Sequence, residues 1–211
     1  MYTLYWSPGS ASLCVHHALI ELGVPHELRA LDLSKGEQKT PAYLALNPNG
    51  VVPTLVVEGR AHYEAASLLM TLADRHPEAK LAPPPASPAR AEYHQWMLHL
   101  ANTVQPAYRI WFYPGEAIDD PTQHDAVKAA ARKRIEAAWA RIDEHLARSG
   151  GHMAGGAYSV ADIYTTMLMR WSRNMPKPAT TWANCKALAD RVKARPAWAT
   201  LYEREGLTEW R

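Results

Sequence analysis

Residues 47–57 constrain the fold of this chain more than any other stretch. The turn-forming cluster Asn47–Gly50 leads into the apolar, β-branched run Val51–Val57, which predicts a buried strand. Pro53 lies inside that run, and a proline cannot donate a hydrogen bond to a sheet. Two interpretations are open at this point. Either Pro53 simply opens the strand, or a cis Val52–Pro53 bond makes a tight turn whose free backbone groups pair with an extended, peptide-like ligand.

Composition excludes several classes of function. The 211 residues include 23 Lys and Arg against 21 Asp and Glu, a formal net charge of +2, which favours neither nucleic acid nor an anionic membrane surface as a partner. The two cysteines, Cys14 and Cys185, are far apart, as is typical of a reduced cytoplasmic protein without disulfides. We expect no signal peptide and no membrane span, since no apolar run approaches the ~20 residues that a bilayer requires.

The first third of the chain alternates between strand and helix patterns. The expected elements are strand 3–6, helix 10–22 with Ser10 or Ser12 as its cap, strand 26–33, helix 41–46, the Pro53 strand, a hairpin at 58–60 leading to strand 61–63, and helix 64–76. The order β-α-β-α-β-β-α implies a parallel pair with a right-handed crossover and an antiparallel edge. This combination predicts a thioredoxin-like domain.

A change in composition after Pro77 predicts a second domain. The segment Pro83–Pro88 is too rich in proline for a helix or central strand, and we expect an extended linker there. Later residues show helical periodicity, and Ser159 with Asp162 forms a variant of the capping box. The expected organisation is therefore a thioredoxin-like domain at 1–77, a linker at 78–88 and an all-helical bundle at 89–211.

Three motifs resemble those of the cytosolic glutathione S-transferases. They are Ser7–Ser12 after the first strand, Asn47–Leu55, and Ser159–Tyr164, and they occur in that family's order across almost the whole chain. The first motif is most similar to bacterial beta-class and insect delta-class members. Delta-class relatives carry a catalytic serine directly after Pro-Gly, which is Ser10 here. Beta-class relatives carry a cysteine one position later, where this chain has Ala11.

Ser10 is the first candidate for catalysis. It lies where a helix begins, and the unpaired N–H groups of a helix N-terminus favour a thiolate over a thiol. A hydroxyl there can donate a hydrogen bond to the sulfur, although a simple capping role remains the alternative. The next candidates are Ser12 and Tyr5. Ala11 argues against cysteine-based disulfide chemistry, and Cys14 reads as a buried apolar residue.

The resemblance also implies residues that bind glutathione. Val52 and Pro53 would pair with its cysteinyl part through a cis-proline turn. Glu64 would contact the γ-glutamyl ammonium group, with a favourable first-turn acid as the alternative role. Many family members have serine after that glutamate, and Ala65 here lacks the hydroxyl, which predicts a weaker grip.

Further candidates are less specific. Gln38 and Lys39 resemble positions that meet the glycyl carboxylate, with solvated side chains as the alternative. For the co-substrate we expect an apolar pocket, or else ordinary core packing, at Asn102, Thr103, Tyr108 and Trp111. Histidine spacing predicts no metal site.

The resemblance thus implies a homodimeric, cytoplasmic glutathione transferase of the detoxification type. It would join the glutathione thiolate to small hydrophobic electrophiles, with glutathione as co-substrate and without metal, nucleic acid or membrane. Two alternatives stay open. One is a non-catalytic module that binds glutathione or hydrophobic ligands on the same fold. The other is a glutathione-dependent peroxidase or thiol reductase.

Overall fold

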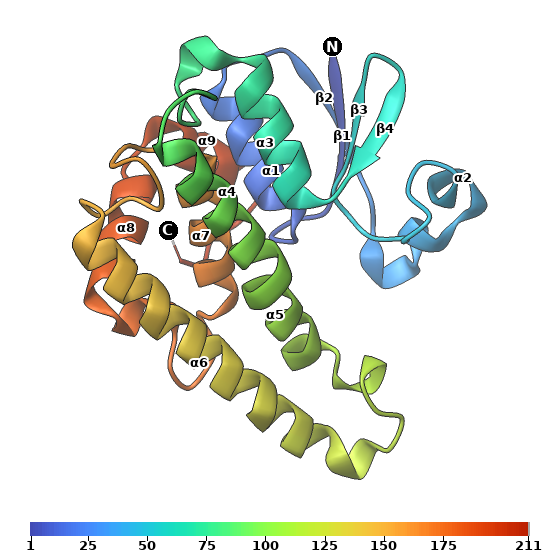
Figure 1. The fold of residues 1–211 in the computed structure, drawn as a ribbon. Coiled ribbons are helices and arrows are strands. Elements are labelled where there is room, and N and C mark those ends of the chain that lie inside the picture. Colours follow the sequence, from blue (N-terminus) through green and yellow to red (C-terminus); the bar gives the residue numbers. More distant parts are fainter. Residues whose placement is uncertain (211) are drawn as a thin grey trace. The chain divides into compact units, whose positions relative to one another are not determined.

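A computed structural model describes residues 1–210, and its N-terminal part is built on one sheet (Figure 1). The strands are β1 (Tyr2–Trp6), β2 (His26–Ala30), β3 (Thr54–Val57) and β4 (Arg60–Tyr63), in the order β2-β1-β3-β4. The β1–β2 pair is parallel, whereas β3 is antiparallel to both β1 and β4. The predicted thioredoxin-like arrangement is confirmed.

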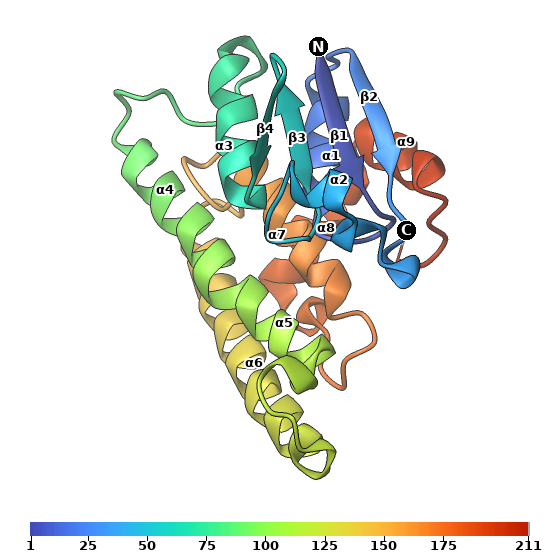
Figure 2. The same cartoon turned by 90° about the vertical axis from the view of Figure 1, so that its right-hand side faces the viewer.

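Three helices accompany these strands: α1 (Ser12–Glu21), α2 (Pro41–Leu44) and α3 (Ala65–Arg75). Helices α1 and α3 pack together on one face of the sheet (Figure 2). Leu4 and Leu55 are fully buried, as are Val15 and Leu19 of α1 and Leu69 of α3. The period-2 and period-3.6 apolar patterns therefore meet in one core.

The start of α1 differs from the sequence prediction. The helix begins at Ser12, and the capping position is held by Ala11, whose side chain makes no capping hydrogen bond. Ser10 lies before the helix, and its hydroxyl donates back to the carbonyl of Ser7 at 2.8 Å. Ser12 is already helical and is not the cap, whereas Ser10 Oγ also accepts the N–H of Ser12 at 3.3 Å and so satisfies one amide at the start of α1, as the capping prediction for Ser10 expects.

The described residues form two compact units, and their limits differ from the predicted domains. Residues 193–210 group with residues 1–82, and residues 83–192 form the other unit. The added segment carries α9 (Pro196–Arg204), which packs on α1. The rings of Trp198 and His17 lie 5.5 Å apart, and Arg195 Nε donates to Glu21 Oε1 at 2.6 Å.

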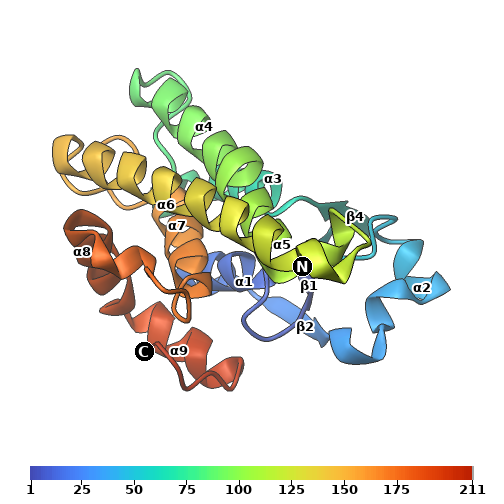
Figure 3. The same cartoon turned by 90° about the horizontal axis from the view of Figure 1, so that it is seen from below.

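The second unit is helical, as predicted. It contains α4 (Ala89–His99), a π-helical turn η4 (Leu100–Val104), α5 (Gln105–Phe112), α6 (His124–Arg148), α7 (Val160–Trp171) and all but the last residue of α8 (Ala183–Lys193). Figure 3 shows α6 running beside α5, against which it packs. Pro106 lacks the N–H that a regular helix would use, which accounts for the irregular turn before it. The Ser159–Asp162 capping box is present at the start of α7.

Short 3₁₀ turns join these elements, at 33–35, 37–39, 77–79, 114–116, 121–123 and 179–181. None of the helices in the described part of the chain is both long and apolar enough to cross a bilayer.

Candidate functional site

The predicted glutathione-binding segments meet at one edge of the sheet. Thr54, the first residue of β3, pairs with Tyr5 of β1 on one side and with Tyr63 of β4 on the other. The loop that follows β1, the bend that precedes β3 and the start of α3 after β4 therefore emerge together. The Gln38 segment follows β2, whose last residue pairs with the last residue of β1.

The loop after β1 holds a small cluster of hydroxyl groups. Ser10 Oγ and Ser12 Oγ lie 2.8 Å apart, and both reach the carbonyl oxygen of Ser7, at 2.8 Å and 3.2 Å respectively. Ser12 is fully buried, whereas Ser10 is partly exposed. The Ser7 carbonyl also accepts the N–H of Ser10 at 3.2 Å. Ser10 can therefore turn its proton toward a ligand while that carbonyl keeps other donors.

Glu205, which no sequence motif indicated, anchors the same loop. One carboxylate oxygen accepts the N–H of Gly9 at 2.9 Å, and the other lies 2.8 Å from Nδ1 of His16. Both the Glu205 and the His16 side chains have 0% exposure. A carboxylate acceptor makes a strong hydrogen bond in such surroundings. Glu205 therefore fixes the residue immediately before Ser10.

A local signal for Glu205 exists in the sequence. Trp198, Leu201 and Tyr202 mark the buried face of α9, and the helical period places Glu205 on that same face. A carboxylate at an apolar-face position needs a buried partner. The period thus reveals that Glu205 has a partner, but not which residue it is.

The bend before β3 contains a cis Val52–Pro53 bond, the conformation that the family resemblance implies. Val52 is buried. Among the described residues, no hydrogen bond uses its N–H or its C=O. Both groups of this residue are thus available at the sheet edge.

Glu64 occupies an unusual backbone conformation at the start of α3. Its φ is +72°, in the left-handed region that favours glycine, and its side chain is exposed and caps nothing in α3. A non-glycine residue in this region is strained, and such strain concentrates at functional sites. Ala65 is 5% exposed, whereas Ser67 is exposed on another side of the helix.

Comparison with known proteins decides the family. Residues 10–75 match the model of the glutathione S-transferase N-terminal domain, and residues 103–203 match that of the C-terminal domain. A solved glutathione S-transferase from Xylella fastidiosa is 30% identical, with a TM-score of 0.90 over 99% of this chain and 100% of that one. The chain belongs to the glutathione S-transferase family.

Two further relatives extend the comparison over nearly the full chain. A sphingomonad glutathione S-transferase solved in complex with glutathione is 32% identical, with a TM-score of 0.85 over 98% of this chain and 100% of that one. A curated glutathione S-transferase of Xanthomonas campestris pv. campestris is 28% identical over 97% of this chain and 98% of its own length.

The three hydroxyls predicted for catalysis in this glutathione S-transferase do not form one cluster. Ser10 and Ser12 hydrogen-bond to each other, whereas the Tyr5 ring packs against the Tyr43 ring of α2, with 5.6 Å between centroids. Burial raises the pKa of the Cys14 thiol, as it does for Cys185, so neither cysteine is suited to be a thiolate nucleophile.

Gln38 and Lys39 lie beside the turn that precedes the Val52 bend. Lys39 Nζ donates to the carbonyl oxygen of Asn49 at 3.3 Å. Gly50 has a φ of +59°, and a Cβ there would come within 2.7 Å of Lys39 Nζ. Gln38 Nε2 lies 3.5 Å from the carbonyl oxygen of Leu33, whereas its own Oε1 is buried without a partner among the described residues. Both side chains therefore have polar atoms near the same edge.

The residues predicted for the co-substrate separate into two environments within residues 83–192. Asn102 and Thr103 are exposed and line a hollow of about 410 Å³ against α6. Tyr108 is fully buried, and its hydroxyl accepts the indole N–H of Trp139 at 2.9 Å. Trp111 is partly exposed. The core-packing alternative therefore describes Tyr108, whereas Asn102 and Thr103 line a hollow whose wall also includes Arg134 and Arg141 and so is not wholly apolar.

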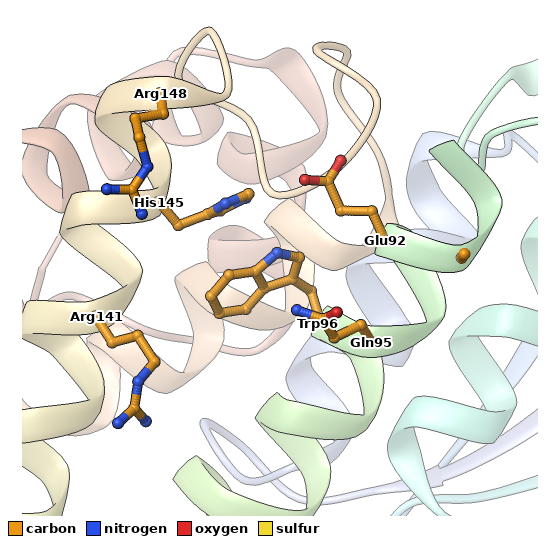
Figure 4. A pocket seen from close by; sticks show the side chains of 7 residues that line it. Glu92, Gln95, Trp96, Arg141, His145 and Arg148 are labelled. Atoms are coloured by element: carbon orange, nitrogen blue, oxygen red, sulfur yellow. The ribbon is translucent and has the colours of Figure 1, made fainter. Parts of the chain in front are cut away.

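A second hollow in this unit, of about 440 Å³, lies between α4 and α6 (Figure 4). Trp96 and His145 face each other in it, with ring centroids 4.2 Å apart. Arg141 and Arg148 project from α6 on either side of His145. None of the four predicted co-substrate residues is in its described lining. Its charged walls make it a poor match for an apolar electrophile.

Within residues 1–210, no three His, Cys, Asp or Glu side chains are arranged to hold a metal ion.

Proposed function

We propose that this chain transfers the thiolate of glutathione to small hydrophobic electrophiles. One observation carries the proposal: the accessible Ser10 hydroxyl, the unused peptide groups of Val52 and the strained Glu64 at the start of α3 lie at the same sheet edge. The sphingomonad relative that was solved with glutathione supports glutathione as the co-substrate.

The size of this edge suits a tripeptide. Neighbouring strands lie about 4.8 Å apart, so the ends of β1, β3 and β4 together span roughly 10 Å. A tripeptide extends about 3.3 Å per residue and covers a similar length. Its central residue would then lie over the Val52 bend, where backbone N–H and C=O groups pair as in an added strand.

Each part of glutathione finds a complementary group along this edge. Glu64 is the candidate partner of the γ-glutamyl ammonium, while the first N–H groups of α3 can bind the α-carboxylate. Lys39 and Gln38 are the candidates for the glycyl carboxylate. Ala65 supplies no hydroxyl, so the γ-glutamyl end of glutathione is bound more weakly than its other end.

The chemical step needs a thiolate, because the thiol form is a poor nucleophile. A free thiol has a pKa of about 8.5, which a hydrogen-bond donor beside the sulfur lowers. Ser10 can supply that donor by turning its proton away from the Ser7 carbonyl. Its hydroxyl acts as a donor and not as a base, and positioning of the electrophile adds to the rate.

The electrophile is proposed to be small and apolar, with Asn102 and Thr103 the first candidates to contact it. Trp111 completes the proposed set, while Tyr108 is fully buried with its hydroxyl bound by Trp139 and supports these residues from the core. We also propose a homodimer that works in the cytoplasm. One observation, the missing hydroxyl at Ala65, favours a second function, a non-catalytic module that binds glutathione or apolar ligands.

The test compares Ser10→Ala with Ser12→Ala and Tyr5→Phe on an aryl halide at saturating glutathione. Ser10→Ala should lower turnover at least about tenfold, the loss expected when a charge-assisted hydrogen bond is removed. An unchanged rate would transfer the role to whichever of the other two variants is slow. Parallel assays with a hydroperoxide and a mixed disulfide separate transferase from peroxidase and reductase. Retention on immobilised glutathione without turnover would favour the binding module.

A further inference from the structure

The carbonyl oxygen of Val51 accepts two side-chain hydrogen bonds just before the cis-proline bend. Tyr43 Oη donates to it at 2.7 Å, and Asn47 Nδ2 donates at 2.8 Å. Thr54 Oγ1 closes the group, 2.7 Å from Tyr43 Oη and 3.1 Å from Asn47 Nδ2. We name Tyr43, Asn47 and Thr54 the Val51 brace.

The brace is buried and its protons are fully used. Tyr43 is 4% exposed, while Asn47 and Thr54 are 0% exposed. Tyr43 gives its one proton to Val51, Asn47 gives one proton to Val51 and the other to Thr54, and Thr54 gives its own back to Tyr43. The remaining acceptor, Asn47 Oδ1, takes the N–H of Asn49 at 3.1 Å. A satisfied buried network holds its members in one geometry.

Tyr43 stays a donor at working pH. Burial raises the pKa of its phenol, an effect that outweighs its hydrogen bonds to Thr54 and Asn47. The Val51 carbonyl therefore keeps both donors wherever the protein is folded near neutral pH.

The brace fixes more than the carbonyl that it touches. The peptide unit joining Val51 to Val52 is planar and trans, so its N–H points opposite to its C=O. With the Val51 carbonyl directed into the brace, the Val52 N–H points away from Tyr43 and Asn47. The next residue, Pro53, has no N–H, so Val52 carries the last free donor before β3.

We propose that Tyr43, Asn47 and Thr54 are positioning residues that aim the Val52 N–H at a backbone carbonyl of the bound tripeptide. They act through the Val51–Val52 peptide and touch no ligand themselves. The inference rests on the proposed function, with the cysteinyl carbonyl of glutathione as the group received. A preset donor strengthens binding because the complex need not order the peptide unit when it forms.

The first test compares Tyr43→Phe with the wild type by calorimetry with glutathione and by steady-state kinetics. Removing one of two donors to the Val51 carbonyl should weaken glutathione binding about 3- to 10-fold, the range of one neutral hydrogen bond. KM for glutathione should rise by a similar factor. At saturating glutathione, kcat should stay within about twofold of the wild type across the pH range. Thr54→Val should weaken glutathione binding in the same way but by a smaller factor. It replaces Tyr43→Phe as the test variant if Tyr43→Phe folds poorly.

Tyr2→Phe is the matched control. It removes a hydrogen-bonded tyrosine hydroxyl from the opposite end of the same sheet, where Tyr2 Oη lies 2.8 Å from His76 Nε2. Glutathione affinity should be unchanged in this variant. The control thus separates a changed orientation of the Val52 N–H from a general weakening of the sheet. A loss in Tyr2→Phe equal to that in Tyr43→Phe would overturn the inference.

A ligand analogue gives the sharper test. The analogue replaces the cysteinyl carbonyl by a methylene, so the wild type should bind it less tightly than glutathione. Because the analogue offers no carbonyl to the Val52 N–H, Tyr43→Phe should bind it almost as tightly as the wild type does. Equal losses from Tyr43→Phe with both ligands would overturn the positioning role. A wild type that binds glutathione no better than Tyr43→Phe would overturn the inference alone. A wild type that binds no glutathione would overturn the proposed function along with it.

Discussion

Glu205 offers the most direct test of how the Gly9–Ser10 loop is held. The variant Glu205→Ala removes the acceptor of the Gly9 N–H and the partner of His16 in one step. The substitution shortens a side chain at a site with 0% exposure, so water cannot readily replace the lost oxygens. Glu203→Ala is the matched control, because Glu203 lies on the same helix and is exposed.

The expected loss follows from the two contacts. A hydrogen bond to a carboxylate contributes about 1.5–3 kcal/mol, so losing the contacts to Gly9 and His16 together should lower the free energy of unfolding by about 3–5 kcal/mol. For a chain of this size each kcal/mol lowers the melting temperature by roughly 2–4 °C, so a fall of about 6–20 °C is expected. Glu205→Gln keeps an oxygen for Gly9 and should lose about 1–2 kcal/mol.

Urea unfolding measures the stabilities, and turnover with an aryl halide reports on the loop. Glu205→Ala should also lower kcat/KM about tenfold at a temperature where it is fully folded, because Gly9 directly precedes Ser10. Glu203→Ala should stay within about 0.5 kcal/mol of the wild type. The reasoning is refuted if Glu205→Ala unfolds at the same urea concentration as Glu203→Ala.

Two further predictions concern the grip on glutathione and the α1–α9 contact. Ala65→Ser should tighten glutathione binding in calorimetry by restoring a hydroxyl beside Glu64, and an equal or weaker affinity would contradict the assigned weakness at this end. Burial opposes ionisation of Glu21, but two hydrogen bonds from Arg195, with the His17 ring 3.4 Å away, outweigh it and hold the pKa of this carboxyl at about 2, below its ordinary 4.5. A depressed carboxyl pKa stabilises the fold above pH 4.5, and this stabilisation is lost as pH falls toward 2. The excess stability of the wild type over Arg195→Ala in urea should therefore shrink between pH 6 and pH 3, and a constant difference would rule out this linkage.

Local rules predicted most of the elements because the signals of each lie within a few residues of one another. The β-branched run around Pro53, the Glu58-Gly59-Arg60 turn and the Ser159 capping box each specify their own geometry. The end of β2 was predicted less accurately. The sequence suggested a strand to Leu33, but the strand stops at Ala30, where its partner β1 ends at Trp6. Strand length depends on the neighbour, which a single segment does not encode.

The residues of the candidate site also divide into those with a local sequence signal and those without one. Ser10, Val52 and Glu64 could be proposed from the sequence, because they lie in or beside local motifs that resemble those of the family. Glu205 and the Tyr43–Asn47–Thr54 group were not, because their roles depend on partners brought close by the fold. Glu205 reaches Gly9 across a separation of 196 residues. The backbone strain at Glu64 also carries no sequence signature, since it depends on how β4 leads into α3.

The grouping of residues 193–210 with residues 1–82 has a consequence for how the chain is made. This unit is discontinuous in sequence, so a ribosome that has synthesised Gly9 must still synthesise all of residues 83–192 before Glu205 is made. Until then the Gly9 N–H and the His16 ring lack their carboxylate. The contacts that hold the Gly9–Ser10 loop therefore form only after the helical residues 83–192 have been synthesised, although the loop itself is made first.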